Sequence, residues 1–202
     1  WATLKRPRQQ QKLPKLISES DIIECLDNYP TQTPLNIRNR SILELLFASG
    51  IRISECIQLS IEDVQLESLS LRVIGKGNKE RMVLFGQRGA FWLNEYLNKV
   101  RSNWALPGCQ WLFVSKQGTR ITPKTIQRLV KDANQYHSSP IQLTPHGCRH
   151  SCASALLTNG ASIRDIQSLL GHASITTTQR YAHIPNKTLK KRFLDVIEPK
   201  TS

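Results

Sequence analysis

The sequence lacks any apolar run long enough to cross a membrane. No window approaches the ~20 consecutive apolar residues of a transmembrane helix, and no signal-peptide pattern opens the chain. We therefore expect a cytoplasmic protein that does not bind a membrane. The chain begins with Trp1 instead of methionine, so we also expect it to be a piece of a longer protein.

Cysteine is scarce, odd in number and scattered, which argues against a disulfide framework and for a reducing cytosol. The pairs His146/His150 and Cys148/Cys152 each have the spacing of one helix face, so a zinc-binding regulatory module is an alternative. The two pairs point to different faces, however, and no second ligand cluster stands elsewhere. We expect no bound metal and no other cofactor. The cysteines are Cys25, Cys56, Cys109, Cys148 and Cys152.

Acidic residues are few beyond the first third of the chain. Residues 1–67 hold eight Lys and Arg against nine Asp and Glu, whereas residues 68–202 hold twenty against six, and the net charge is +13. This distribution predicts a polyanionic partner, double-stranded DNA, with binding that weakens steeply as salt rises. The alternative is a solvated basic surface that keeps the protein soluble.

The hydrophobic spacing predicts a mostly helical (α+β) fold with a small antiparallel β-sheet. Residues 1–15 are basic and proline-containing, typical of an extended linker, and residues 16–202 suit one domain. Ser18 and Asp21 form a capping-box pattern before the first expected helix. Further helices are expected at 36–49, around Glu55, at 90–104 with an aromatic core face, and from Thr122 to about 135. Strands are expected at 69–74 and 81–85, and a strand or buried turn at 111–114.

Most of the candidate chemistry lies between residues 143 and 183, in three expected helical pieces separated at 159–160 and at Gly171. His146 and Arg149 are three residues apart and share a helix face. A tyrosine phenol has a pKa of ~10, so Tyr181 needs a base such as histidine to become a nucleophile at neutral pH. Arginine supplies donors that fit phosphate oxygens. The set suits attack on a phosphodiester, although each residue taken alone is more typical of a surface or core position.

Three motifs resemble one family. His146-x-x-Arg149-His150, then Gly171-His172, then Tyr181 resembles the C-terminal signature of tyrosine recombinases (the phage integrase family), especially the bacterial Xer type. Upstream, ASGIRISE (48–55) resembles the first-arginine box, and VIGKGNKERMVLFG (73–86) resembles the lysine hairpin. The resemblance implies the tyrosine recombinase catalytic-domain fold over residues 16–202. It also implies that residues 1–15 link to an N-terminal core-binding domain that is absent from this sequence.

The resemblance also implies a catalytic set. Tyr181 would be the nucleophile, His146 its proton acceptor, and Lys76 the general acid for the leaving 5′-oxygen. The other members would hold the non-bridging phosphate oxygens. Glu55 is either a residue that orients the first arginine or an ordinary helix-start glutamate. The six expected catalytic residues are Arg52, Lys76, His146, Arg149, His172 and Tyr181.

A second group of basic residues is expected to contact DNA outside the reacting phosphate. Lys124 and Arg128 lie with Lys131 along one side of a predicted helix, where a purely solvated face is an equal alternative. Lys79 is also a rival of Lys76 on the hairpin, but better suits a backbone contact. The expected DNA-binding residues are Lys79, Arg81, Lys124, Arg128 and Arg180.

By resemblance, the function is site-specific DNA recombination through a covalent 3′-phosphotyrosine, with the Xer role of chromosome-dimer resolution in chromosome partition and cell division. The alternatives are a transposon or phage integrase, a type IB topoisomerase, and a non-catalytic DNA-binding protein. Residues 187–197 form an expected basic amphipathic helix. In the family this tail docks into a neighbouring subunit of a homo- or hetero-tetramer, and packing onto its own domain is the alternative.

Overall fold

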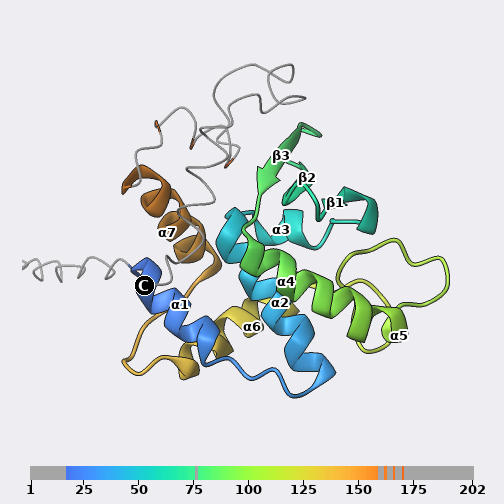
Figure 1. Cartoon of the computed structure of the whole chain (residues 1–202), viewed down its shortest axis with the longest axis horizontal. Helices are drawn as coiled ribbons and strands as arrows, with labels where there is room; N and C mark the ends of the chain where they lie inside the picture. Colours follow the sequence, from blue (N-terminus) through green and yellow to red (C-terminus); the bar gives the residue numbers. More distant parts are fainter. Residues whose placement is uncertain (1–16, 76, 159–161, 163–165, 167–169, 171–202) are drawn as a thin grey trace, which may run out of the picture.

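The computed structural model describes residues 17–75, 77–158, 162, 166 and 170. In this part of the chain, helices pack around a shared core and a small sheet stands at one end (Figure 1). The expected linker 1–15 and the expected helix 187–197 lie outside the described residues. Among those described, no helix has the length and apolar character to span a membrane.

The first helix begins at the predicted capping box, and the second begins two residues before the predicted start and ends where predicted. Helix α1 spans Glu19–Asp27, and its capping box is confirmed: Asp21 N donates to Ser18 Oγ at 3.1 Å, and Ser18 N donates to Asp21 Oδ2 at 2.9 Å. Helix α2 spans Pro34–Ser49, with Thr33 as its N-cap. It ends at Gly50, whose φ of 60° is a left-handed conformation that glycine adopts without strain.

The sheet follows a short helix, α3 (Ile53–Cys56), and a 3₁₀ turn, η1 (Ile61–Asp63). Strands β1 (Val64–Gln65), β2 (Ser70–Ile74) and β3 (Glu80–Leu84) pair antiparallel in that order. In the β2–β3 register, Leu71 faces Val83 and Val73 faces Arg81. The two longer strands confirm the predicted hairpin, whereas β1 was not predicted.

The next helical stretch is longer than predicted at its start. Helix α4 (Gln87–Tyr96) continues as a π-helical turn, η2 (Leu97–Arg101), and as α5 (Ser102–Trp104). Its expected aromatic core face is only partly right: Tyr96 is fully buried, but Phe91 is 57% exposed. The Tyr96 hydroxyl donates to Leu112 O and accepts from Val114 N, at 3.1 and 3.0 Å. These bonds hold the segment 111–114, which pairs only as isolated bridges, inside the core.

Helix α6 (Pro123–Ala133) starts at the predicted Thr122 cap and leads into a 3₁₀ turn, η3 (Asn134–Tyr136). Helix α7 (Pro145–Thr158) is the first of the three pieces predicted between 143 and 183. It packs against α1 and α2. Helix α2 therefore lies centrally, with α4, α6 and α7 in contact with it (Figure 1).

Two groups of buried side chains fill the interior. The larger one joins α1, α2, the sheet, α4 and α6. The smaller one joins the end of β3 to α7 and to the two described helical residues that follow α7. It therefore holds Ile166 and Leu170, the last described residues before Gly171, against α7 and β3. Its members are Leu84, Cys152, Leu156, Ile166 and Leu170.

Candidate phosphate-binding site

Arg52 lies between the end of α2 and the start of α3, a position set by the left-handed turn at Gly50. Its backbone N donates to Glu55 Oε2 at 2.8 Å, and its Nη1 donates to Glu55 Oε1, also at 2.8 Å. The Arg52 side chain is 40% exposed, whereas that of Glu55 is 3% exposed. A buried carboxylate therefore holds a partly exposed guanidinium at the molecular surface.

Glu55 is also bound from the sheet. Arg81 on β3 donates Nη1 to Glu55 Oε1 and Nη2 to Oε2, both at 2.9 Å, in the bidentate geometry of a strong arginine–carboxylate pair. Burial alone would raise the pKa of the Glu55 carboxyl, but the hydrogen bonds and charges of Arg81 and Arg52 lower it overall. Glu55 is therefore ionised at neutral pH and joins α3 to β3.

The Glu55–Arg81 ion pair lies against Gly75, at the base of the β2–β3 hairpin. Gly75 N donates to Lys79 O at 2.8 Å and closes the turn. A Cβ added at Gly75 would lie 3.2 Å from Arg81 Nη1 and 3.6 Å from Glu55 Oε1. Gly75 thus packs directly on the ion pair. Lys76, the expected general acid, is the next residue and lies outside the described residues.

Arg149 reaches the site from α7. Its Nη1 donates to Gly50 O at 2.6 Å and its Nη2 donates to Leu170 O, so it joins the end of α2 to the segment before His172. Burial lowers the pKa of Arg149 to about 10; the positive charges of Arg52 and Arg81 act in the same direction, and Glu55 opposes them. Arg149 thus stays charged at neutral pH, within electrostatic range of Arg52.

His146 precedes Arg149 by one turn of α7 and is exposed. The α7 start that carries it is held by Thr144, whose Oγ1 accepts from Gly147 N at 2.9 Å. The structure therefore brings Arg52, Arg149 and the base of the Lys76 hairpin together, with His146 on the same helix as Arg149. The expected site residues His172 and Tyr181 lie outside the described residues.

The expected DNA-binding residues fall into two groups. Lys79, Lys124 and Arg128 are exposed, and the buried face of α6 is opposite, at Ile126, Leu129, Val130 and Ala133. Arg81 differs: its side chain is 9% exposed and bonded to Glu55. Alternation along β3 was the signal for this, because Arg81 shares a face with buried Val83. Arg180 lies outside the described residues.

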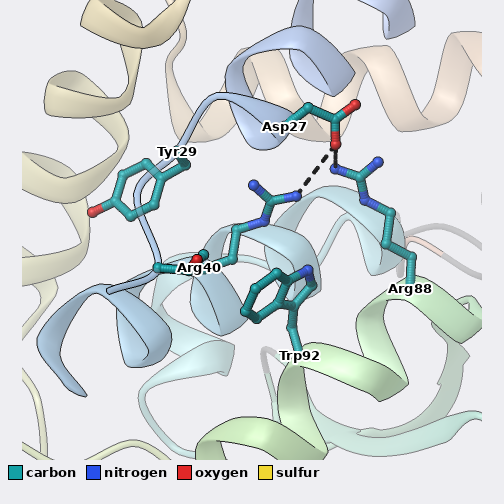
Figure 2. Close-up of a pocket in the computed structure, with 6 residues that line it drawn as sticks. Asp27, Tyr29, Arg40, Arg88 and Trp92 are labelled. Carbon is teal, nitrogen blue, oxygen red and sulfur yellow. Dashed lines mark hydrogen bonds and ion pairs between the residues drawn. The ribbon is translucent and has the colours of Figure 1, made fainter. Parts of the chain in front are cut away.

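Sequence reasoning missed a second charged cluster, on α1, α2 and α4. Arg40 and Arg88 both bond Glu44 Oε1 at 2.7 Å, and Arg88 also bonds Asp27 at 2.7 Å. The Arg40 guanidinium lies 5.1 Å from the Trp92 ring centroid. Figure 2 shows these arginines converging on Asp27 beside a pocket of about 350 Å³. This cluster stabilises the packing of α4 on α2.

The cysteines are free thiols, and most are buried. Burial raises the pKa of Cys25 to about 11 and those of Cys148 and Cys152 to about 12 each. These thiols therefore stay protonated at neutral pH, the form that does not ligate metals. Within the described part of the chain, no group of three or more His, Cys, Asp or Glu side chains is arranged to hold a metal ion.

Comparison with known proteins gives consistent results. A model of the phage integrase family matches residues 15–187. The tyrosine recombinase XerC of Vibrio parahaemolyticus is 38% identical over 93% of this chain, and the chain covers 60% of that protein's length. The XerA recombinase structure superposes with a TM-score of 0.71 at 28% identity, covering 98% of this chain and 68% of that one. The XerH site-specific recombinase, solved with its difH substrate in a pre-cleavage complex, gives 0.70 at 25% identity, covering 92% and 55%.

Proposed function

The chain belongs to the phage integrase family, and we propose that it is the catalytic part of an Xer-type site-specific DNA recombinase. The observation that carries the proposal is the convergence of Arg52 and Arg149 from separate elements beside the anchored base of the Lys76 hairpin. Two guanidinium groups from different directions suit the two non-bridging oxygens of one phosphate.

The proposed reaction rests on the resemblance to tyrosine recombinases together with the chemistry of the six residues. Tyr181 Oη attacks phosphorus and passes its proton to His146, while Lys76 gives a proton to the departing 5′-oxygen. Arg52, Arg149 and His172 stabilise the charge that builds on the non-bridging oxygens in the transition state. The product is a 3′-phosphotyrosine and a free 5′-hydroxyl. A 5′-hydroxyl from a partner strand reverses the step, so the phosphodiester bond energy is conserved without ATP.

The proposed partner is double-stranded DNA in a cytoplasmic setting, in agreement with the charge of +13 and with the DNA-bound state of the XerH relative. Because the chain spans about 60% of its XerC relative, we propose that residues 1–15 link it to a core-binding domain. We further propose that residues 187–197 dock between subunits of a tetramer. Chromosome-dimer resolution, and through it chromosome partition and cell division, is the proposed role.

A trapping experiment tests the proposal. The chain is incubated with a pool of duplexes of randomised sequence, each with a nick that lets the short cleaved strand diffuse away. SDS-resistant protein–DNA adducts are then isolated and sequenced. We expect adducts from the natural chain in EDTA, enriched for one sequence, and none from Tyr181→Phe, which still binds the enriched duplex.

Tyr136→Phe is the matched control, because Tyr136 is a half-buried tyrosine that packs on Tyr29 away from the site. This variant should form the adduct at the natural rate. An adduct that persists in Tyr181→Phe, or no adduct from the natural chain on any duplex in the pool, contradicts the proposal.

A further inference from the structure

Arg81 was expected to contact DNA, yet its position suits a different task. Its guanidinium is turned inward from β3, 9% exposed, and bound through two nitrogens to both oxygens of Glu55. Its two Nη groups already form the bidentate bond to the Glu55 carboxylate. Its contacts with Glu55 and with Gly75 give it an effect on a bound phosphate through the groups that Glu55 and the hairpin hold.

Glu55 Oε1 is shared between two arginines. It accepts from Arg52 Nη1 at 2.8 Å and from Arg81 Nη1 at 2.9 Å. Glu55 Oε2 accepts from Arg81 Nη2 at 2.9 Å and also from the Arg52 backbone N at 2.8 Å. The two Arg81 bonds hold the carboxylate plane from β3, and without them only the bonds from Arg52 would act on its last side-chain torsion, which is broad in glutamate. The Arg52 guanidinium would then lose its fixed reference on the sheet.

Arg81 acts at the same time on the hairpin. Gly75, the residue before Lys76, lies so close to Arg81 that a Cβ added at Gly75 would be 3.2 Å from Arg81 Nη1. Arg81 of β3 pairs with Val73 of β2, two residues before Gly75. Its guanidinium lies against Gly75, whose N closes the turn by donating to Lys79 O. The Arg81 side chain therefore contacts both Glu55, which binds Arg52, and Gly75, which precedes Lys76 in the chain.

We infer that Arg81 is a positioning residue: through Glu55 and Gly75 it fixes the position of Arg52 relative to the β2–β3 hairpin that carries Lys76. The inference rests on the proposed function for the roles of Arg52 and Lys76. It is argued from geometry: Arg52, which directly precedes α3, and Gly75, which directly precedes Lys76, both lie against the buried Glu55–Arg81 ion pair. A misplacement of about 1 Å in such groups costs roughly 10²-fold in rate.

Arg81→Lys separates this role from a DNA contact. Lysine keeps the charge, so it would preserve a simple phosphate contact, but it cannot make the bidentate bond to Glu55. We expect the variant to bind the enriched duplex with natural affinity and salt dependence. We expect single-turnover cleavage at saturating protein to fall about 10²-fold. Arg72→Lys is the matched control, because Arg72 lies on β2 and bonds the buried carboxylate of Asp63 at 2.8 Å; its cleavage rate should not change.

The leaving group identifies which catalytic group is displaced. A duplex with sulfur in place of the bridging 5′-oxygen releases a thiolate, which needs no proton because a thiol has a pKa of only ~8.5. Lys76→Ala should therefore regain its activity on this duplex, whereas Arg52→Ala should not. The roughly 10²-fold loss of cleavage rate in Arg81→Lys should have two parts, one from the displaced hairpin and one from the displaced Arg52. On the sulfur duplex the variant should regain about 10-fold, the hairpin part, and the Arg52 part of the loss should remain.

Gly75→Ala is a second variant that changes no charge. The added methyl group presses on Arg81 Nη1, so the same pattern of slowed cleavage and partial recovery is expected in a smaller degree. Cleavage by Arg81→Lys within twofold of natural, or no recovery on the sulfur duplex, overturns the inference. So does a lower salt dependence of Arg81→Gln with an unchanged saturated rate, since that is the behaviour of a phosphate contact.

A DNA-free measurement keeps the inference separate from the proposed function. The Arg52 side-chain N–H signals in NMR should exchange slowly in the natural chain and faster in Arg81→Lys, with no change in Arg72→Lys. If the natural chain forms no adduct but the Arg52 side-chain N–H groups still exchange faster in Arg81→Lys, the proposed function fails. The positioning of Arg52 by Arg81, which we call the link, then still holds. If Arg52 exchange is unchanged, the link fails whatever the chain does to DNA.

Discussion

Arg149 Nη1 donates to the carbonyl oxygen of Gly50, 99 residues earlier in the chain, at 2.6 Å. The acceptor is the residue that ends α2 in a left-handed conformation, two residues before Arg52. One glycine thus sets the course of the chain into Arg52 and supplies the oxygen that orients Arg149. The positions of both arginines depend on the same backbone turn.

Gly50→Ala is expected to lower both stability and cleavage. Its φ of 60° costs a residue with a Cβ about 1 kcal/mol or more, and the added Cβ would lie 2.7 Å from Leu170 Cδ2. We expect the free energy of unfolding in urea to fall by about 2–4 kcal/mol. Gly108→Ala is the control, because Gly108 has a φ of 76° with open space around its Cβ position, and should lose only the backbone part. Equal losses in the two variants would contradict the role of the Leu170 contact.

Glu55→Gln is expected to flatten the acid side of the stability profile. The folded pKa of Glu55 lies below the ordinary value of 4.5, so its ion pairs stabilise the fold above that value, and this contribution is lost as pH falls through the folded pKa. The difference in unfolding free energy between the natural chain and Glu55→Gln should therefore shrink between pH 6 and pH 3. Glu62→Gln is the control for removing an exposed carboxylate and should change the unfolding free energy little. A constant difference for Glu55→Gln would show that its charge is not involved.

Glu44→Gln is expected to destabilise the fold with little direct effect on the site. It removes the charge that Arg40 and Arg88 share, and Arg40 is 3% exposed. Breaking a buried pair on one side typically costs about 3–5 kcal/mol. Thermal unfolding measures the loss. The salt bridge of Lys99 and Glu95 is solvent-exposed on its lysine side, and Glu95→Gln should cost less than about 1 kcal/mol. A similar small loss in Glu44→Gln would contradict the structural importance of the cluster beside the pocket in Figure 2.

Lys124→Gln and Arg128→Gln test whether α6 faces DNA. Both side chains are exposed on the face opposite the buried stripe of α6. If each contacts one phosphate, each substitution should lower the slope of log binding constant against log salt by about 1. Fluorescence anisotropy on the enriched duplex measures this slope. Lys116→Gln, another exposed cation, should leave it unchanged. Unchanged slopes for both α6 variants would favour the solvated-face alternative.

Local signals in the sequence predict the element boundaries well. The Ser18 capping box, the Thr122-Pro123 helix start and the stop at Gly50 all depend on short-range hydrogen bonds or φ values. The start of α2 at Pro34 was predicted two residues too late. The two-residue strand β1 was missed because so short a segment carries no periodicity. The π-helical turn at Leu97–Arg101 was missed because its hydrogen-bond shift leaves no mark on residue type.

In the candidate site, too, features set by local sequence were predicted and those set by tertiary contacts were not. Motif spacing places His146 and Arg149 on one helix, and the structure agrees. It does not reveal that Arg81 binds Glu55 or that Glu44 binds two arginines, because each partner comes from a distant element. The sequence therefore predicts which groups are available, but their pairing depends on tertiary contacts. The alternation of β3 was the one local hint, and it pointed Arg81 inward.

The smaller buried cluster has a consequence for biosynthesis. It draws on Leu84 from the sheet but needs Cys152, Leu156, Ile166 and Leu170, which leave the ribosome much later. A nascent chain therefore exposes Arg52 and its hairpin for several seconds, at ordinary translation speeds of about 5–20 residues per second, before Arg149 can join them. During that interval Arg149 has not yet bonded Gly50 O and Leu170 O, so the two arginines come together only after α7 and Leu170 have been synthesised.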